Sequence, residues 1–381
     1  MRSALTPQQS CSHGGSHVRF ADLAHHCFAM KQLRPLLLAL FVALLTYPAG
    51  AQQPAAGPPT FTNPLLPSGA DPWSIYRNGY YYYTHTTGHN ITLWKTKSLS
   101  QLKTAPSKVV WTPPATGPNS HDIWAPELHF LNGKWYLYYA ADAGTNQSHR
   151  LWVLENASPD PLEGTWVDKG QLRDPSDKWA IDGSVFENNG QHYLVWSGWE
   201  GDVNGCQSIY LARLKNPWTV DGPRLKVSTP FFGWERNGDI SNPEDPPHID
   251  VNEGPEVLRH GNKLVLIYSA SGCWTDFYAL GMLTAPADSD LLQPGSWTKS
   301  PEPVFQQNPA AKVFAPGHNS FFKSPDGTQD WILYHANSEP GQGCGQFRSP
   351  RAQPFTWRAD GTPLLGRPVA PGQPLARPSG E

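Results

Sequence analysis

One pattern recurs five times along this chain of 381 residues. Each copy contains a short apolar segment, a turn built on Asn-Gly or a close relative of it, and a second segment rich in aromatic residues. The copies start at Asp71, Ala125, Asp182, Glu253 and Gly317. Two apolar segments joined by such a turn are typical of a β-hairpin. The chain is therefore constrained to fold as an array of similar β units.

The spacing of the copies indicates which kind of array they form. Their turn glycines lie 54 to 71 residues apart, at Gly79, Gly133, Gly190, Gly261 and Gly327. A third apolar segment follows each hairpin, as at 91–99, and most copies close with a short fourth one, as at 164–170. Several strands within a period above about 40 residues are typical of a propeller. No long amphipathic helix pattern follows Ala51. We therefore predict an all-β, five-bladed β-propeller with four antiparallel strands per blade.

The composition supports this fold and narrows the class of ligand. The chain has 16 Trp, 14 Tyr, 15 Phe, 34 Gly and 39 Pro, which favours short strands joined by turns. Its net charge is −3 and it has no basic run, so nucleic-acid binding is not expected. Most aromatic side chains are expected to fill the core. The others could stack on the C–H faces of a neutral carbohydrate.

The N-terminal segment has the pattern of a secretory signal peptide. Lys31 and Arg34 precede an apolar run at 35–46, and Ala49-Gly50-Ala51 provides a cleavage signature. The run is too short for a membrane span. We therefore predict secretion to the extracellular space or the periplasm.

The expected domain organisation follows from the signal and the repeats. It comprises an N-terminal extension and cleaved signal peptide at 1–51, a disordered lead-in at 52–60, the propeller at 61–367 and a poorly ordered tail at 368–381. An insertion near 229–250 is expected to form a loop at the rim of the central cavity. We expect a monomer.

Three cysteines follow the cleavage site, Cys206, Cys273 and Cys344, and their spacing matches no zinc motif. We interpret them as buried or partly buried thiols. One disulfide remains an alternative in an exported protein.

Three carboxylates occupy one register of the repeats. The residue eight positions before each turn glycine is, in order, Asp71, Ala125, Asp182, Glu253 and Asn319. The fifth turn is longer, so His318 is an alternative for the last place. Equivalent positions on innermost strands converge on the propeller axis. Acids at such positions also occur simply as turn residues, but three in one register favour a glycoside hydrolase, which needs an acid and a second carboxylate.

The strings that surround these positions resemble family 43 glycoside hydrolases, which are five-bladed propellers that invert the anomeric centre. The strings are GADPW at 69–73, IWAPE at 123–127, IDGS at 181–184, NEGPEV at 252–257 and APGHNS at 315–320. The resemblance implies that Asp71 is the general base and Glu253 the general acid, and that Asp182 orients the acid and raises its pKa. Inversion leaves room for a water, so the Asp71 and Glu253 carboxyl groups should lie about 6.5–9.5 Å apart.

The substrate-binding residues follow from the same comparison. Trp73 and Trp124 flank the first two sites and offer stacking faces, and Trp274 either lines a subsite or packs. The resemblance favours Arg351, rather than Arg348, as the arginine that faces the sugar hydroxyls.

His318 has two interpretations. The resemblance places it in the axial cavity as a sugar contact or near a calcium or other ion held largely through water, whereas a packed histidine would bond to a backbone carbonyl. We expect no cofactor for the chemistry itself and only a structural role for any calcium.

The closest resemblance is to exo-acting α-1,5-L-arabinofuranosidases, which implies arabinan, arabinoxylan or their oligosaccharides from plant cell walls as substrate. A β-xylosidase and an endo-arabinanase are the alternatives on the same scaffold. A non-catalytic sugar-binding propeller and a retaining fructan hydrolase are the alternatives from other classes.

Overall fold

The computed structural model describes residues 59–243 and 245–381. Within these ranges the secondary structure consists of 22 strands and five short 3-10 helices, so the prediction of an all-β fold is confirmed. None of the helices described there is long and apolar enough to span a membrane. The predicted signal peptide, and residues 52–58 of the predicted lead-in, lie outside the described residues.

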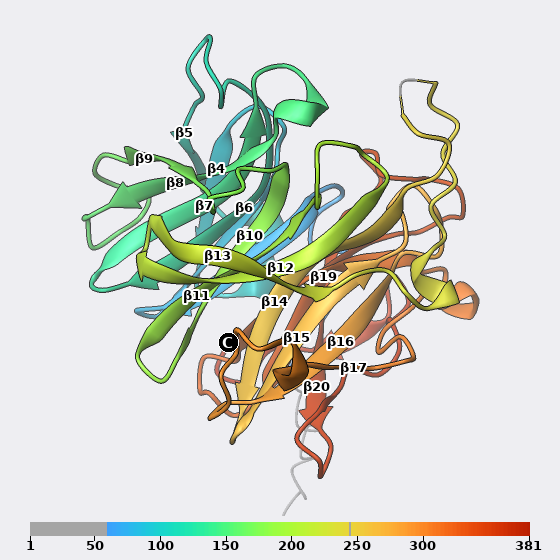
Figure 1. Cartoon of the computed structure of the whole chain (residues 1–381). Coiled ribbons are helices and arrows are strands. Elements are labelled where there is room, and N and C mark those ends of the chain that lie inside the picture. The colour runs from blue at the N-terminus through green and yellow to red at the C-terminus, as the bar shows by residue number, and fades with distance from the viewer. Residues whose placement is uncertain (1–58, 244) are drawn as a thin grey trace, which may run out of the picture. The chain divides into compact units, whose positions relative to one another are not determined.

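Twenty of the strands form five antiparallel meanders of four strands, one for each sequence repeat (Figure 1). The first comprises β2 (Ala70–Arg77), β3 (Tyr80–Thr86), β4 (Ile91–Thr96) and β5 (Ser107–Trp111). The second comprises β6 (His121–Leu131), β7 (Lys134–Asp142), β8 (Arg150–Asn156) and β9 (Val167–Leu172). The third comprises β10 (Ala180–Asn188), β11 (Gln191–Gly198), β12 (Cys206–Asn216) and β13 (Thr219–Ser228). The fourth comprises β14 (Asp250–His260), β15 (Lys263–Ala270), β16 (Ala279–Pro286) and β17 (Thr298–Lys299). The fifth comprises β18 (Phe314–Lys323), β19 (Asp330–Asn337), β20 (Ser349–Trp357) and β21 (Pro363–Leu364).

The first strands of the meanders are neighbours in space. Strand β2 contacts β6, β6 contacts β10, β10 contacts β14, β14 contacts β18, and β18 contacts β2 again. The third and fourth meanders are also joined by a short parallel pairing of β12 with β14. Residues at the start of each first strand are thereby gathered from segments far apart in the sequence.

Aromatic residues of the second and third strands fill the space between adjacent meanders. Tyr82 of β3 packs edge-on against Trp135 of β7, with ring centroids 5.2 Å apart. Both belong to an apolar cluster that also includes Leu93 of β4 and Leu137 of β7. Burial of this apolar surface is the main force that holds one meander to the next.

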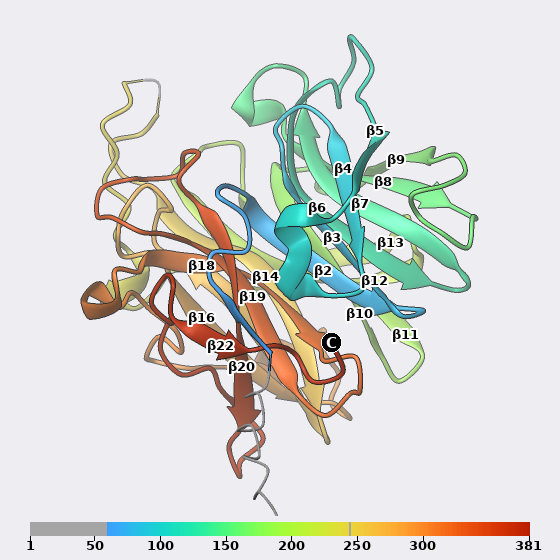
Figure 2. The ribbon, with the colours of Figure 1, turned by 180° about the vertical axis from the view of Figure 1, so that it is seen from behind.

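The C-terminal segment is not a poorly ordered tail, which corrects the expectation for 368–381. Strand β22 (Pro374–Ala376) pairs antiparallel with β1 (Thr60–Thr62), and the two lie together on the side of the molecule seen in Figure 2. The side chain of Glu381 accepts a hydrogen bond from the backbone N–H of Leu99. A strand of three residues has too little pattern to be recognised alone, since its stability comes from its partner.

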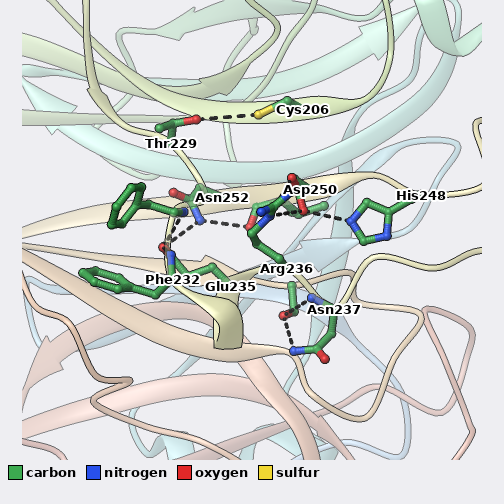
Figure 3. A network of polar contacts seen from close by, with 12 residues as sticks. Cys206, Thr229, Phe232, Glu235, Arg236, Asn237, His248, Asp250 and Asn252 are labelled. Atoms are coloured by element: carbon green, nitrogen blue, oxygen red, sulfur yellow. Dashed lines mark hydrogen bonds and ion pairs between the residues drawn. The ribbon is translucent and has the colours of Figure 1, made fainter. Parts of the chain in front are cut away.

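The segment between β13 and β14 contains the 3-10 helix η3 (Gly233–Glu235) and is anchored by a buried carboxylate (Figure 3). The Glu235 side chain accepts hydrogen bonds from the backbone N–H of Phe232 and the side chain of Asn252, over 2.9 and 3.1 Å. Lys299 lies 2.6 Å from the same carboxylate. Four other 3-10 helices lie in connecting segments: η1 (Leu99–Thr104), η2 (Asn146–Ser148), η4 (Pro294–Ser296) and η5 (Pro309–Ala311).

Candidate active site

The first strand of every meander is distorted near its start. The pairing register shifts there in each of them, for example between Ala70 and Trp73 in β2 and between Ile181 and Ser184 in β10. At the shift that the five strands share, one residue has a left-handed backbone: Asp71 (φ 55°), Ala125 (43°), Asp182 (56°), Gly254 (54°) and His318 (46°). Strands β6 and β18 have a second such residue beside an earlier shift, Asp122 and Ala315. Such conformations are uncommon for residues other than glycine, and β-bulges re-aim side chains. The fifth place in the register thus belongs to His318 rather than to Asn319.

The distorted strand starts surround one cavity of about 770 Å³. Asp71, Asp182 and Glu253 all line it, together with His318. Asp71 is 9% exposed and Asp182 4% exposed, whereas Glu253 is partly exposed. The three acids line one cavity, but they do not share one register: strand pairing makes Glu253 equivalent to Ala70 and Ile181, and Gly254 equivalent to Asp71 and Asp182.

Asp71 is held as a carboxylate. Thr86 donates a hydrogen bond to its Oδ2 over 2.6 Å, and Nη1 of Arg348 lies 3.3 Å from its Oδ1. Burial alone would raise the pKa of Asp71, but His318, Arg348, His335 and the Thr86 hydroxyl together lower it well below its usual value. Burial lowers the pKa of His318 itself, so the lasting positive charge beside Asp71 is the Arg348 guanidinium.

His335 supports the backbone of Asp71. The N–H of Asp71 donates a hydrogen bond to Nδ1 of His335 over 3.0 Å. An Nδ1 that accepts a hydrogen bond carries no proton, so His335 is the neutral tautomer with its proton on Nε2. Burial also favours the neutral form of His335, because it lowers the pKa of this histidine well below the usual value. The histidine therefore helps to hold Asp71 in its left-handed conformation.

Glu253 is poised to carry a proton. The Tyr278 hydroxyl donates a hydrogen bond to its Oε1 over 2.8 Å. Burial raises the pKa of Glu253 to about 7; the charge of Asp71 adds to this rise, and the Tyr278 hydrogen bond opposes it. A carboxyl group with such a pKa is suited to general acid catalysis near neutral pH.

Asp182 and Glu253 influence each other's ionisation, so the expected role of Asp182 in raising the pKa of the acid stays a prediction. Burial is the first cause of the raised pKa of Glu253. Burial, followed by the charge of Glu253, raises the pKa of Asp182 well above its usual value. Its Oδ2 accepts a hydrogen bond from the N–H of Gly254 over 2.9 Å. Asp182 thus fixes the backbone beside Glu253.

Two of the predicted sugar-binding residues lie elsewhere. Trp73 is buried in the apolar cluster between the first two meanders, where its Nε1 donates to the Leu128 carbonyl over 3.0 Å. Arg351 is fully buried and donates to the Ser338 hydroxyl over 2.8 Å. The arginine that lines the cavity is Arg348, so the preference for Arg351 over Arg348 is corrected.

Trp124 and Trp274 do line the cavity. Trp124 stacks on His149 with ring centroids 4.0 Å apart. The Trp274 indole N–H donates to the carbonyl of Asp239 over 2.9 Å, which ties it to the segment between β13 and β14. That segment also contributes Ile240 and Asp245 to the cavity wall, as expected for a rim insertion.

A disulfide forms part of the same wall. Cys273 and Cys344 are bonded and both line the cavity, so the interpretation of these two cysteines as thiols is wrong. Their bond joins the loop that carries Trp274 to the loop that leads to Arg348. Cys206 is exposed and forms no disulfide.

Among the residues that the structure describes, the side chains form no cage for a metal ion. Within the described residues, no three or more His, Cys, Asp or Glu side chains are grouped so that they could hold one. Nδ1 of His318 lies 3.2 Å from Oδ1 of Asp71, so this nitrogen is directed at the carboxylate. Calcium prefers six to eight oxygen ligands, so an ion beside His318 would have to be held largely through water, and calcium stays a prediction.

Sequence reasoning missed Thr86, His335 and Tyr278. Thr86 had a usable signal, because it stands opposite Ala70 in the β2–β3 hairpin and so beside Asp71. His335 had none, since it reaches Asp71 from the fifth meander through tertiary packing. Tyr278 stands in the same meander as Glu253, but it lies outside the hairpin whose pattern the sequence shows.

Comparison with known proteins agrees with this geometry. Residues 61–363 match the family model described as glycosyl hydrolases family 43. An extracellular exo-α-(1→5)-L-arabinofuranosidase of Streptomyces avermitilis is 40% identical over 88% of this chain and 69% of its own length. A protein of the same name from Streptomyces chartreusis is 40% identical over 80% of this chain and 91% of its own length. The crystal structure of an α-L-arabinofuranosidase from Lactobacillus brevis superposes with a TM-score of 0.75 at 36% identity, covering 82% of this chain and 98% of that one. This chain therefore belongs to glycosyl hydrolase family 43.

Proposed function

We propose that this protein is an inverting, exo-acting α-L-arabinofuranosidase that releases L-arabinofuranose from arabinan or arabino-oligosaccharides. The observation that carries the proposal is the pair of contrasting carboxyl groups in one cavity. Asp71 has a pKa held well below its usual value, whereas the pKa of Glu253 is raised to about 7. Two carboxyl groups whose environments separate their pKa values in this way supply a base and an acid at the same pH.

Each acid takes one role in the reaction. Asp71 accepts a proton from a water molecule as the oxygen of that water attacks the anomeric carbon. Glu253 donates its proton to the glycosidic oxygen as the bond between that oxygen and the anomeric carbon breaks. Asp182 holds the backbone beside Glu253 through the N–H of Gly254. One water is consumed, the anomeric configuration inverts, and a second turnover requires proton exchange between the two carboxyl groups and solvent.

We also propose that the five meanders close into a five-bladed propeller with the cavity at its axis. The contacts that run from β2 through β6, β10 and β14 to β18 and back to β2 support this arrangement. In such a fold the first strand of each blade lies innermost, which explains why one cavity receives side chains from five separate repeats.

The cavity wall suits a neutral sugar. Trp124 and Trp274 supply aromatic surface, and Arg348 supplies hydrogen-bond donors beside Asp71. The rim segment between β13 and β14 adds Ile240 and Asp245 to the cavity wall. A wall completed by such an insertion supports release from chain ends over internal cleavage. The names of the two Streptomyces relatives support arabinofuranose as the released sugar.

The same relatives are named as extracellular proteins, which supports secretion of this one. The signal-like segment at 31–51 is consistent with that location. We propose that the mature enzyme acts as a monomer on plant cell-wall polysaccharide.

The proposal is tested by incubating the protein with linear α-1,5-arabinan, an aryl α-L-arabinofuranoside and an aryl β-D-xyloside. Arabinose as the sole early product from arabinan, first seen by NMR as the β anomer, is the expected result. Early arabino-oligosaccharides would instead indicate an endo-arabinanase, and cleavage of the xyloside alone a β-xylosidase. Full hydrolysis by Asp71→Ala or Glu253→Ala would refute the assigned roles.

A further inference from the structure

We propose that Tyr278 is a positioning residue that orients the Glu253 carboxyl group for proton donation and couples it to the surroundings of Asp71. The proposal rests on the hydrolase function proposed above. Tyr278 immediately precedes β16, is fully buried, and is absent from the described residues that line the cavity. Tyr278 therefore acts on the reaction only through Glu253. The Tyr278 hydroxyl donates a hydrogen bond to Oε1 of Glu253 over 2.8 Å.

The ring of Tyr278 is held in a single orientation. On one side lies Gly317, where an added Cβ would come within 2.1 Å of the Tyr278 Cε1 atom, so only glycine leaves room for the ring. The His335 ring is parallel to it, with centroids 5.8 Å apart and an angle of 3° between the planes. A hydroxyl on a ring confined in this way has a fixed position, and so does the hydrogen bond that it makes.

Two connections run from Tyr278 to Asp71. The first passes through His335, which packs against Tyr278 and whose Nδ1 accepts the Asp71 N–H over 3.0 Å. The second passes through Ser269, whose hydroxyl lowers the pKa of the nearby Tyr278 phenol and accepts the N–H of His318 over 2.8 Å. Nδ1 of His318 in turn lies 3.2 Å from Oδ1 of Asp71. The acid and the base are thus fixed by one set of contacts.

The hydrogen bond determines which oxygen of Glu253 carries the proton. Because Oε1 accepts from Tyr278, the proton of the neutral acid belongs on Oε2. When that proton moves to the glycosidic oxygen, the carboxylate that remains is stabilised by a charge-assisted hydrogen bond from Tyr278. Burial raises the pKa of Tyr278 well above its usual value, so the phenol stays a donor throughout the cycle.

The test compares Tyr278→Phe with the unmodified enzyme on leaving groups of different basicity. An arabino-oligosaccharide needs protonation of its leaving oxygen, whereas dinitrophenyl α-L-arabinofuranoside needs little. Since general acid catalysis contributes about 10²–10⁴ in rate, we expect kcat/KM to fall about ten- to hundredfold on the oligosaccharide and less than about threefold on the dinitrophenyl substrate. The alkaline limb of the pH profile should move to higher pH, because a donor that lowers the pKa of Glu253 is removed.

Tyr138→Phe is the matched control. Tyr138 is also fully buried, and its hydroxyl donates a hydrogen bond to the carbonyl of Pro217 over 2.7 Å. Loss of the Tyr138 hydrogen bond should change kcat/KM by the same factor on both substrates and leave the alkaline limb of the pH profile unmoved. Equal losses on the two substrates in Tyr278→Phe, or an unmoved alkaline limb, would overturn the proposal.

Ser269→Ala provides a second and milder variant. It removes one connection to Tyr278 but keeps the phenol, so a smaller loss with the same preference for the dinitrophenyl substrate is expected. Equal losses on both substrates in this variant would also count against the coupling. Failure of the unmodified enzyme to hydrolyse either arabinofuranoside would refute the proposed function itself, which is a separate outcome.

Discussion

The backbone N–H of Asp71 and Nδ1 of His335 are 3.0 Å apart and form a buried hydrogen bond between β2 and β19. The hydrogen bond links the first meander to the last, near the start of β2, where the proposed general base Asp71 lies. Replacing the histidine by phenylalanine would keep a ring of similar size but leave the N–H without an acceptor. An unpaired buried donor costs about 1–3 kcal/mol.

We therefore expect His335→Phe to lower the free energy of unfolding by about 1–3 kcal/mol. It should also lower kcat more than it changes KM, because Asp71 would lose part of its backbone support. Urea unfolding and steady-state kinetics measure the two effects. His260→Phe is the control: His260 is exposed and stacks on Trp357, so less than about 0.5 kcal/mol is expected there. Equal destabilisation by both variants would contradict the interpretation of the His335 hydrogen bond.

The pH dependence of kcat/KM should follow the two proposed catalytic carboxyl groups. Activity requires Asp71 ionised and Glu253 protonated. The acidic limb is expected below the usual range for an aspartate, because the pKa of Asp71 is lowered, and the alkaline limb near pH 7, because the pKa of Glu253 is raised to about 7. A profile measured with an arabino-oligosaccharide checks both limbs. Full activity well above the Glu253 pKa would refute its role as the acid.

Glu253 should also make stability depend on pH. Its pKa is raised from 4.5 to about 7 in the folded protein, so the unfolded chain releases this proton first as pH rises. The favourable contribution of the protonated form is fully present below the unfolded pKa and is lost as pH rises through the folded one. We expect Glu253→Gln to raise the free energy of unfolding by about 1–3 kcal/mol at about pH 8, and with it the melting temperature. At about pH 4 the substitution should change neither by much. Thermal unfolding at the two pH values measures this, and an equal shift at both would contradict it.

Arg348 and Arg351 should respond differently to the same substitution. Arg348→Met removes the charge 3.3 Å from Oδ1 of Asp71, so the acidic limb of kcat/KM should move to higher pH and KM should rise. Arg351→Met removes a buried group that bonds to Ser338, so it should lower the melting temperature without moving that limb. Paired pH profiles and melting curves separate the two. A shifted limb in Arg351→Met would place that residue nearer the carboxylates than its contacts indicate.

The hairpin pattern was enough to predict the convergence of Asp71 and Asp182, because a turn fixes the register of the strands beside it. Glu253 reaches the same cavity from one residue before the equivalent place, since Gly261 opens its turn whereas Gly79 closes the turn of the first hairpin. The same reasoning failed for Trp73, which lies two residues beyond Asp71. In a regular strand these residues would face the same side, but the register shift between Ala70 and Trp73 breaks the alternation and places the indole in the core.

Other differences arise where tertiary contacts decide. Arg348 and Arg351 are three residues apart, and only the position of Arg348 just before β20 (Ser349–Trp357) leaves its side chain at the cavity. Tyr278 and His335 carry no local pattern, since their importance lies in contacts with Glu253 and Asp71. The pairing of β1 with β22 joins segments at opposite ends of the described chain, which no short window can show.

The left-handed residue at the start of each first strand has a consequence for engineering. Three of the five repeats present a carboxylate or an imidazole there, the fourth has Gly254, and the second presents only the methyl group of Ala125. Its backbone already has the required conformation, with φ 43°, and its N–H donates to the Thr86 hydroxyl over 2.7 Å. A designer who wishes to graft a fourth acid, a thiol or a reporter group near Asp71 would therefore begin at Ala125, whose backbone already has the required shape, and would make room for the new side chain, since Ala125 is 2% exposed.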